Sequence, residues 1–137
     1  RLGAEVLFWK TKLKPGGSIM AAVKDGKLIL GLSGNPGAAV LSLMRLAVPY
    51  IRKLCGYAEL RLPVVSVILK EAFHKASPKR RLLRGRLEIL DGKAYFAENK
   101  GQGNGAVFSL VDCDLIGEID AGSAPLPAGT VIKAYRI

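Results

Sequence analysis

Reactive and metal-binding side chains are scarce in this sequence. It contains one histidine, His74, and two cysteines, Cys55 and Cys113, among 137 residues. These three side chains do not supply a Ser–His–acid triad or a Cys–His pair, and their spacing is not that of a structural zinc site. Two distant cysteines also do not form a disulfide framework. We therefore expect no metal ligands in this chain and a cytoplasmic location.

Long hydrophobic runs are absent as well. The longest apolar stretch, residues 38–51, is interrupted by Arg45 and Pro49 and falls short of the roughly 20 residues that a membrane-spanning helix needs. The chain begins on Arg1 without a methionine or a signal-like segment, a start that predicts a piece of a longer chain. We expect a soluble protein with no membrane partner.

Acidic residues are few relative to basic ones. The sequence has 21 lysines and arginines against 11 aspartates and glutamates, a formal net charge of +10. The summed field of such a surface attracts anions. Phosphate-bearing ligands, RNA and an acidic protein all fit as partners.

The first part of the chain predicts an α/β arrangement. Residues 5–9 are apolar and aromatic and predict a short buried strand. Residues 18–23 and 27–32 predict a hairpin, because Asp25-Gly26 between them suits a tight turn. Asn35 can cap a helix that begins at Pro36. Apolar residues then recur at helical spacing up to Leu54, which predicts a long helix that packs on a sheet.

Some details of this helix also follow from the sequence. Arg45, Arg52 and Lys53 mostly occupy the side opposite to its apolar face. Pro49 predicts a kink, and Gly56 predicts the end of the helix.

The second part of the chain predicts an all-β domain. Short strand-like runs occur at residues 64–69, 83–90, 93–97, 106–111 and 130–136. Turn or loop residues lie between several of them, including Asp91-Gly92. Strands of this length and spacing are typical of a small barrel or sandwich. We predict a first unit over residues 1–57 and a β domain over residues 62–137.

Two segments are candidate anion sites. Lys10, Lys12 and Lys14 precede Pro15 and two glycines, so their ammonium groups lie beside a loop that can approach a ligand closely. A solvated basic edge is the alternative. The segment 33–36, Ser-Gly-Asn-Pro, lies where a strand ends and a helix begins, a place where backbone N–H groups attract anions. The alternative here is an ordinary capped helix.

Residues 75–86 form the densest positive segment, with six lysines and arginines. It could clamp phosphates or follow a nucleic-acid backbone, or it could be a solvated loop. Aromatic residues at stacking intervals do not accompany it, which argues against nucleic acid. Asp112 and Asp114 could share one face of a strand, but nothing marks them as a metal pair.

The order of these motifs resembles a known family. Phe-Trp-Lys at 8–10, Leu-Lys-Pro-Gly at 13–16, a hairpin, Gly-Leu-Ser-Gly-Asn-Pro at 31–36 and an amphipathic helix ending in Leu-Cys-Gly at 54–56 resemble the end of the third domain of MoeA and gephyrin E-domain proteins. That domain is MogA-like. Leu-Arg-Gly at 83–85, Gln-Gly-Asn-Gly at 102–105 and Pro-Ala-Gly-Thr-Val at 127–131 resemble the family's barrel-like C-terminal β domain, its domain IV.

The resemblance implies an enzyme, a molybdopterin molybdenumtransferase. Members of the family transfer molybdenum from molybdate to adenylylated molybdopterin, release AMP and use magnesium. The resemblance also implies that magnesium is held by residues outside this chain, that this piece alone is inactive, and that the full-length protein is a homodimer. The expected partners are the pterin ligand and molybdate.

The resemblance also assigns site residues. Lys10 and Lys14 match the paired active-site lysines. The cofactor-binding candidates are Ser33, Gly34, Asn35, Pro36, Arg84 and Asn104. Three positions depart from the family pattern, because Gly17 replaces a lysine, Ser33 a proline and Asn104 a serine. Ser33 and Asn104 can still form hydrogen bonds to a ligand, whereas the loss of the lysine weakens the anion site.

Two other function classes stay open at this point. One is a basic RNA- or DNA-binding module built on a small β barrel, which the charge and residues 75–86 favour. The other is a scaffold or interaction module like that of gephyrin, because a fold does not determine a function.

Overall fold

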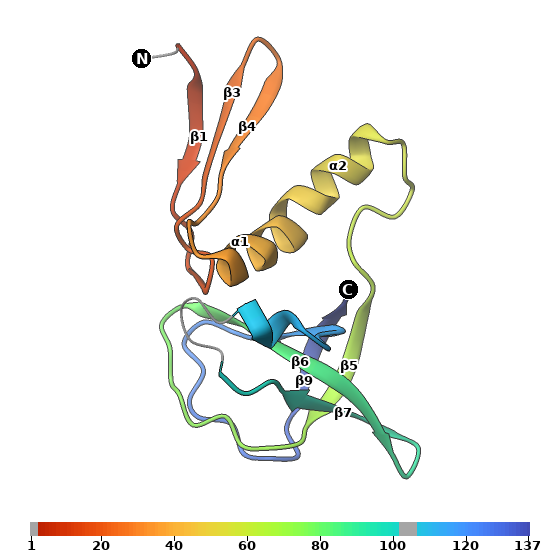
Figure 1. Cartoon of the computed structure of the whole chain (residues 1–137). Helices are drawn as coiled ribbons and strands as arrows, with labels where there is room; N and C mark the ends of the chain where they lie inside the picture. The colour runs from red at the N-terminus through yellow and green to blue at the C-terminus, as the bar shows by residue number, and fades with distance from the viewer. Residues whose placement is uncertain (1–2, 102–106) are drawn as a thin grey trace.

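The structure, a computed structural model, describes residues 3–101 and 107–137. A small sheet and a helix lie at one end of the molecule and a β barrel at the other (Figure 1). In chain order the elements are β1 (Glu5–Trp9), β2 (Leu13–Lys14), β3 (Met20–Lys24), β4 (Lys27–Gly31), α1 (Pro36–Ser42), η1 (Leu43–Ala47), α2 (Val48–Leu54), β5 (Val64–Leu69), β6 (Arg80–Leu90), β7 (Lys93–Glu98), η2 (Val107–Leu110), β8 (Leu115–Ile119) and β9 (Val131–Arg136).

The small sheet has the strand order β1-β3-β4. The predicted hairpin is confirmed, and its turn residues Asp25 and Gly26 have φ angles of 49° and 72°, the positive values that a tight hairpin turn needs. The strand at 5–9 is also confirmed, but the prediction that it is buried is wrong. Trp9 is 71% exposed and Val6 is 54% exposed, because β1 lies at an edge and pairs only with β3.

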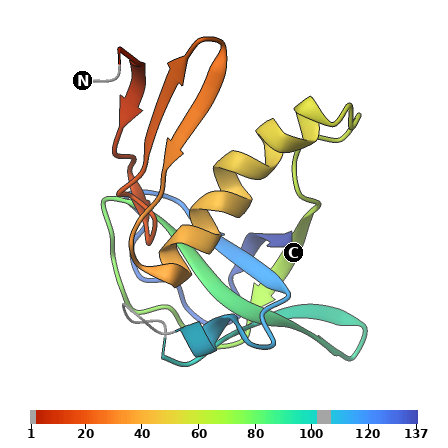
Figure 2. The same cartoon turned by 45° about the horizontal axis from the view of Figure 1, so that its top comes forward.

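One continuous helical segment runs from Pro36 to Leu54 (Figure 2). The Asn35 side chain caps it as predicted, since the Ala38 N–H donates to Asn35 Oδ1 at 3.0 Å. A π-helical segment, η1, ends at Ala47, two residues before Pro49. Pro49 has no N–H to donate, and the kink that the sequence predicts at Pro49 stays a prediction. No helix in the described part of the chain is both long and apolar enough to cross a membrane.

The helix packs against the barrel. Leu41 of α1 forms a buried cluster with Leu82 of β6, Ile116 of β8 and Tyr135 of β9. The prediction that Arg45 lies on the side of the helix opposite to its apolar face was wrong. Arg45 Nε lies 3.3 Å from Glu118 Oε2 on β8, so this side chain faces the barrel.

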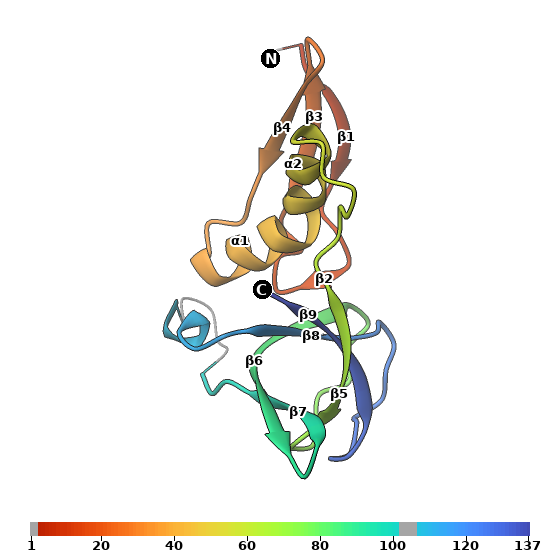
Figure 3. The same ribbon diagram turned by 90° about the vertical axis from the view of Figure 1, so that its right-hand side faces the viewer.

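The barrel contains five strands in the order β6-β7-β5-β9-β8, and pairing between β6 and β8 closes it (Figure 3). Phe96 of β7 is 1% exposed and fills its interior. Gly85 and Gly117 leave room for this ring, because a Cβ at either position would lie within about 3 Å of Phe96. The short strand β2 pairs in parallel with β6, so residues before 57 also extend this sheet.

Four of the five strand predictions for the barrel were correct, although β6 begins three residues earlier than predicted. The runs at 64–69, 83–90, 93–97 and 130–136 correspond to β5, β6, β7 and β9. The prediction of a strand at 106–111 was wrong, because residues 107–110 form a 3-10 turn, η2, and Phe108 is 89% exposed. Ala106 lies outside the described residues. Strand β8 was missed, since Gly117 at its centre lowers its strand propensity.

Candidate functional site

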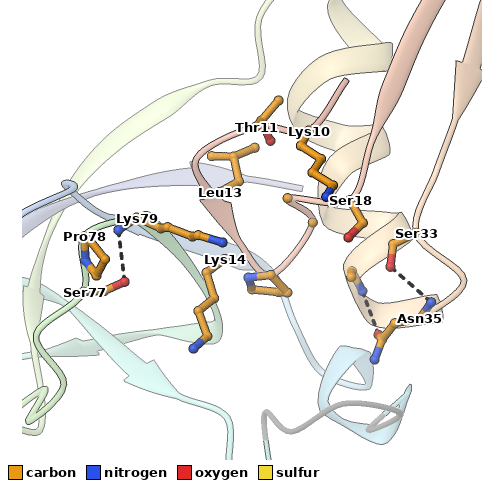
Figure 4. A pocket seen from close by; sticks show the side chains of 14 residues that line it. Lys10, Thr11, Leu13, Lys14, Ser18, Ser33, Asn35, Ser77, Pro78 and Lys79 are labelled. Atoms are coloured by element: carbon orange, nitrogen blue, oxygen red, sulfur yellow. Dashed lines mark hydrogen bonds between the residues drawn. The ribbon is translucent and has the colours of Figure 1, made fainter. Parts of the chain in front are cut away.

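A basic cavity of about 770 Å³ lies where the loop after β1, the start of α1 and the loop before β6 meet (Figure 4). Its described lining includes three lysines, Lys10, Lys14 and Lys79, and no carboxylate. The remaining described lining residues are mostly polar or small, with Leu13 and two prolines as apolar members: Thr11, Leu13, Pro15, Gly16, Gly17, Ser18, Ser33, Asn35, Ala38, Ser77 and Pro78. Hydroxyl, amide and ammonium groups without an opposing acid favour an anionic ligand.

The loop that carries the first two lysines is held by backbone hydrogen bonds. The Lys10 N–H donates to Ile19 O at 2.8 Å, and the Thr11 N–H donates to Gly17 O at 2.9 Å. Lys10 itself has a positive φ of 67°. The buried Ser42 hydroxyl lies 3.2 Å from Gly16 O and 2.9 Å from Ala38 O, so its one proton is shared between the loop and α1. Both lysines are therefore carried by an ordered segment.

Gly17 has no space for a side chain in this loop. A Cβ there would lie 2.7 Å from Leu13 O and 2.9 Å from Thr11 O, closer than carbon and oxygen can approach. Gly17, which stands where the family pattern has a lysine, is therefore required by the close approach of the backbone in this loop. The third lysine of the cavity comes from the barrel instead.

Lys79 and Ser77 were not among the predicted site residues. They lie in the loop between β5 and β6, where the Lys79 N–H donates to Ser77 Oγ at 3.2 Å. In Figure 4 the Lys79 side chain extends toward Lys14 from the barrel side of the cavity. The density of positive charge at 75–86 was the sequence signal that could have found them.

Ser33 and Asn35 occupy the helix side of the cavity. The Asn35 N–H donates to Ser33 Oγ at 3.3 Å, and the Asn35 side chain caps α1. The structure thus brings Ser33 and Asn35 into the same cavity as Lys10 and Lys14. Gly34 lies between these two residues and Pro36 follows them, but neither is part of the described lining.

Lys10 and Lys14 point in different directions. In Figure 4 the Lys10 side chain extends toward Ser18, whereas the Lys14 side chain extends away from it. Lys14 also lines a second cavity, with a volume of about 540 Å³. The two lysines therefore face two parts of one basic region.

Arg84 lies under the start of the helix and is 2% exposed. A Cβ at Gly37 would collide with Arg84 Nη1, so this glycine lets the guanidinium approach α1. Burial lowers the pKa of Arg84, and the nearby Cys113 and Glu98 act in the opposite direction. Arg84 is not part of the described lining of either cavity. Asn104 lies outside the described residues.

The basic segment 75–86 does not form one continuous strip. Arg84 is buried, and Arg80 pairs with Glu118 at 3.5 Å and with Asp120 at 3.1 Å. Lys79 faces the first cavity and Arg81 faces the second. This distribution does not favour the nucleic-acid alternative, which needs cations along one face.

Within residues 3–101 and 107–137, no three His, Cys, Asp or Glu side chains are grouped as metal ligands would be. Asp114 accepts a hydrogen bond from the Leu87 N–H at 2.8 Å and so holds the backbone of β6. The described residues do not fit a magnesium site.

The architecture is that of a closed barrel joined to a helix and a small sheet, with a basic cavity between them. The family model described as MoeA C-terminal region (domain IV) matches residues 66–137, more than half of the chain. The chain belongs to this family and is a C-terminal portion of a MoeA protein.

Several relatives carry the name molybdopterin molybdenumtransferase. The chain is 30% identical over 129 residues to the protein from Staphylococcus aureus strain Mu50, and 28% identical over the same length to that from Staphylococcus epidermidis strain ATCC 35984. Each alignment covers 94% of this chain and 31% of the relative. The chain thus spans about a third of the length of the curated relatives it matches.

Solved structures support the fold. The molybdopterin biosynthesis MoeA protein from Pyrococcus horikoshii aligns with a TM-score of 0.74 and 20% identity, over 96% of this chain and 32% of that one. A molybdenum cofactor biosynthesis protein from Pyrococcus furiosus aligns with a TM-score of 0.75 and 19% identity, over 98% of this chain and 46% of that one. At this identity the likeness shows the fold alone.

Proposed function

We propose that this chain is the C-terminal portion of a molybdenum insertase, an enzyme that transfers molybdenum from molybdate to adenylylated molybdopterin with release of AMP. The observation that carries the proposal is the cavity with Lys10, Lys14 and Lys79 and no carboxylate in its described lining. Molybdate and a phosphorylated pterin are both anions, and the family's transferases act on such ligands. Membership of that family supports the choice of reaction.

The role of the described residues in this proposal is binding and orientation. Lys10 and Lys14 neutralise the charge of the bound anion, and Ser33 and Asn35 contact it from the helix side of the cavity. The helix that begins at Pro36 directs its positive end toward the same region. Arg84 and Gly34 act from beside the cavity, and Asn104 stays a candidate ligand contact from sequence alone.

Further parts of the proposal concern the complete protein. We propose that magnesium is held by residues outside this chain, that the complete protein is a homodimer and that it is cytoplasmic. The free thiols of Cys55 and Cys113 support the last point. We also propose residues 1–57 and 62–137 as parts of two domains, the first MogA-like.

The test is binding and turnover by the complete protein that carries this chain. Lys10→Ala and Lys14→Ala should each weaken binding of molybdate or of the adenylylated pterin by roughly 1.5–3 kcal/mol, the range for a charge-assisted hydrogen bond. Lys24→Ala, in the exposed hairpin, is the matched control and should bind as the unchanged protein does. If both cavity variants kept full affinity and turnover while Arg84→Ala abolished both, the anion site would lie in the barrel.

The chain by itself should not insert molybdenum. Purified residues 1–137, incubated with molybdate, magnesium and adenylylated molybdopterin, should release no AMP above background. Turnover by this piece would contradict the assignment of magnesium to residues outside it.

A further inference from the structure

Ser42 is a polar residue at the end of α1 that lies wholly inside the protein. It is 0% exposed and is not part of the described lining of the first cavity, although Ala38, one helical turn before it, is. Its hydroxyl lies 2.9 Å from Ala38 O and 3.2 Å from Gly16 O. One side chain of the helix therefore reaches the backbone of the loop that carries Lys10 and Lys14.

A serine is not the residue that the helix itself would favour at position 42. A serine inside a helix bonds the carbonyl four residues earlier, and alanine stabilises a helix better. Ser42 makes that bond to Ala38 O, but its hydroxyl is also shared with Gly16 O, 26 residues away in the chain. The second acceptor gives Ser42 a role outside the helix.

The loop lies directly against the helix at Gly16. This glycine is buried and has a φ of 93°, a backbone conformation that other residues rarely adopt. A Cβ at this position would collide with Ser42 Oγ and lie 3.3 Å from Ala38 O. The absence of a side chain at Gly16 thus lets its carbonyl come within hydrogen-bond distance of the Ser42 hydroxyl.

One stiff residue connects Gly16 to Lys14. Pro15 is the only residue between them in the chain, and its ring fixes φ. Lys14 is exposed, and an exposed lysine has many side-chain conformations. The position of its backbone therefore decides which region its ammonium group can reach.

Gly17 connects the same turn to Lys10. Gly17 O accepts the N–H of Thr11, the residue after Lys10, at 2.9 Å. The φ of Lys10 is 67°, a conformation that costs a non-glycine residue energy and persists only where its surroundings hold it. The backbone at residues 16 and 17 is thus part of what holds Lys10 in place.

We propose that Ser42 is a positioning residue of the first cavity. Its hydroxyl holds Gly16 against α1 and so places Lys10 and Lys14 for an anion that Ser42 itself does not touch. The proposal rests on the proposed function, because it takes that anion to be molybdate or the adenylylated pterin. The helix then orders the loop of the cavity as well as lining it.

The experiment is equilibrium dialysis of molybdate with the complete protein that carries this chain. Ser42→Ala removes the hydroxyl and favours the helix, so the protein should stay folded. Its dissociation constant for molybdate should rise about three- to tenfold, as expected for the loss of one hydrogen bond. Ser42→Thr keeps a hydroxyl that can bond the same carbonyls and should bind molybdate more tightly than Ser42→Ala does.

A double-mutant cycle distinguishes positioning from a general loss of structure. If Ser42 acts through the lysines, Lys10→Ala and Lys14→Ala should each weaken molybdate binding by a smaller factor in the Ser42→Ala background than in the unchanged protein. Ser66→Ala, the same substitution at an exposed position of β5, is the control and should bind molybdate normally. Equal factors in both backgrounds, or normal affinity in Ser42→Ala, would overturn the proposal.

Failure of the proposed function has a different outcome. If Ser42→Ala weakens molybdate binding non-additively with the lysine variants but the complete protein releases no AMP, the positioning role stands and the insertase assignment falls. If AMP release is intact and Ser42→Ala binds molybdate normally, the insertase assignment stands and the positioning role falls.

Discussion

Arg45 Nε lies 3.3 Å from Glu118 Oε2, and this contact joins the helical segment η1 to strand β8 of the barrel. Glu118, whose side chain is 7% exposed, also forms an ion pair with Arg80, whose Nη1 lies 3.5 Å from Glu118 Oε1. The Arg45 guanidinium lies 4.4 Å from the centre of the Tyr135 ring. Burial and a hydrogen bond to Glu118 raise the pKa of Tyr135. The contacts among Arg45, Glu118 and Tyr135 thus fix the helix against the barrel. The basic cavity is lined by residues from both parts.

Glu118→Gln should destabilise the chain. The change removes a nearly buried charge and leaves Arg45 and Arg80 without their shared carboxylate, so we expect a loss of about 1–3 kcal/mol in the free energy of unfolding. Urea denaturation followed by circular dichroism measures this. As a control, Glu88→Gln removes the exposed pair with Lys70 and should cost less than about 1 kcal/mol.

A double-mutant cycle with Arg45→Met measures the interaction energy between Arg45 and Glu118 separately from the effect of each single substitution. Coupling of about 0.5 kcal/mol or more between Arg45→Met and Glu118→Gln is expected for residues in contact. Additive effects would show that the contact does not contribute to joining helix and barrel.

Gly85→Ala should destabilise the barrel. A Cβ at Gly85 would lie 2.6 Å from Ala97 O and 2.6 Å from Phe96 Cε2, so strand β6 or the ring must move, at a cost of about 1–3 kcal/mol. Thermal unfolding measures the change. Gly34→Ala is the control, because a Cβ there meets nothing within 4 Å. Equal melting temperatures for the two variants would show that Phe96 does not need the glycine.

Asn35 has two separable roles, a cap and a cavity wall. Asn35→Ala removes the acceptor for the Ala38 N–H and should cost about 1 kcal/mol of stability. Asn35→Asp keeps the cap but adds a negative charge to the cavity, so its stability should stay close to that of the unchanged chain while molybdate binding falls. Denaturation and equilibrium dialysis on the same preparations check both. Normal molybdate affinity in Asn35→Asp would place the anion away from the helix.

The two free cysteines should differ in reactivity. Cys55 is exposed and Cys113 is half-buried. Burial raises the pKa of Cys113, so less of it is the nucleophilic thiolate at neutral pH than an ordinary thiol would supply. With limiting iodoacetamide at pH 7.5, mass spectrometry should find Cys55 modified well before Cys113. Cys55→Ser is the control, and rapid labelling of Cys113 in that variant would contradict the burial.

Local features of the fold could be predicted from the sequence. Asp25-Gly26 and Asp91-Gly92 predicted two turns because few other residue pairs adopt positive φ at both positions, and the structure has those angles. Asn35 before Pro36 predicted the helix start for a similarly local reason. Where apolar residues were taken as a sign of burial or of a strand, as at Trp9 and Phe108, the prediction failed, because burial depends on what packs against a residue.

The sequence by itself determined the turns, the helix start, most barrel strands and the excess of cations, since each follows from residues close together in the chain. Only the tertiary structure decided how those cations are distributed. Closure of the barrel places Lys79 in one cavity and Arg81 in the next, turns Arg80 toward Glu118 and buries Arg84 under α1. Neighbouring residues in a strand point to opposite sides. When distant strands pair, the basic residues of one segment therefore come to line cavities, to form an ion pair or to be buried.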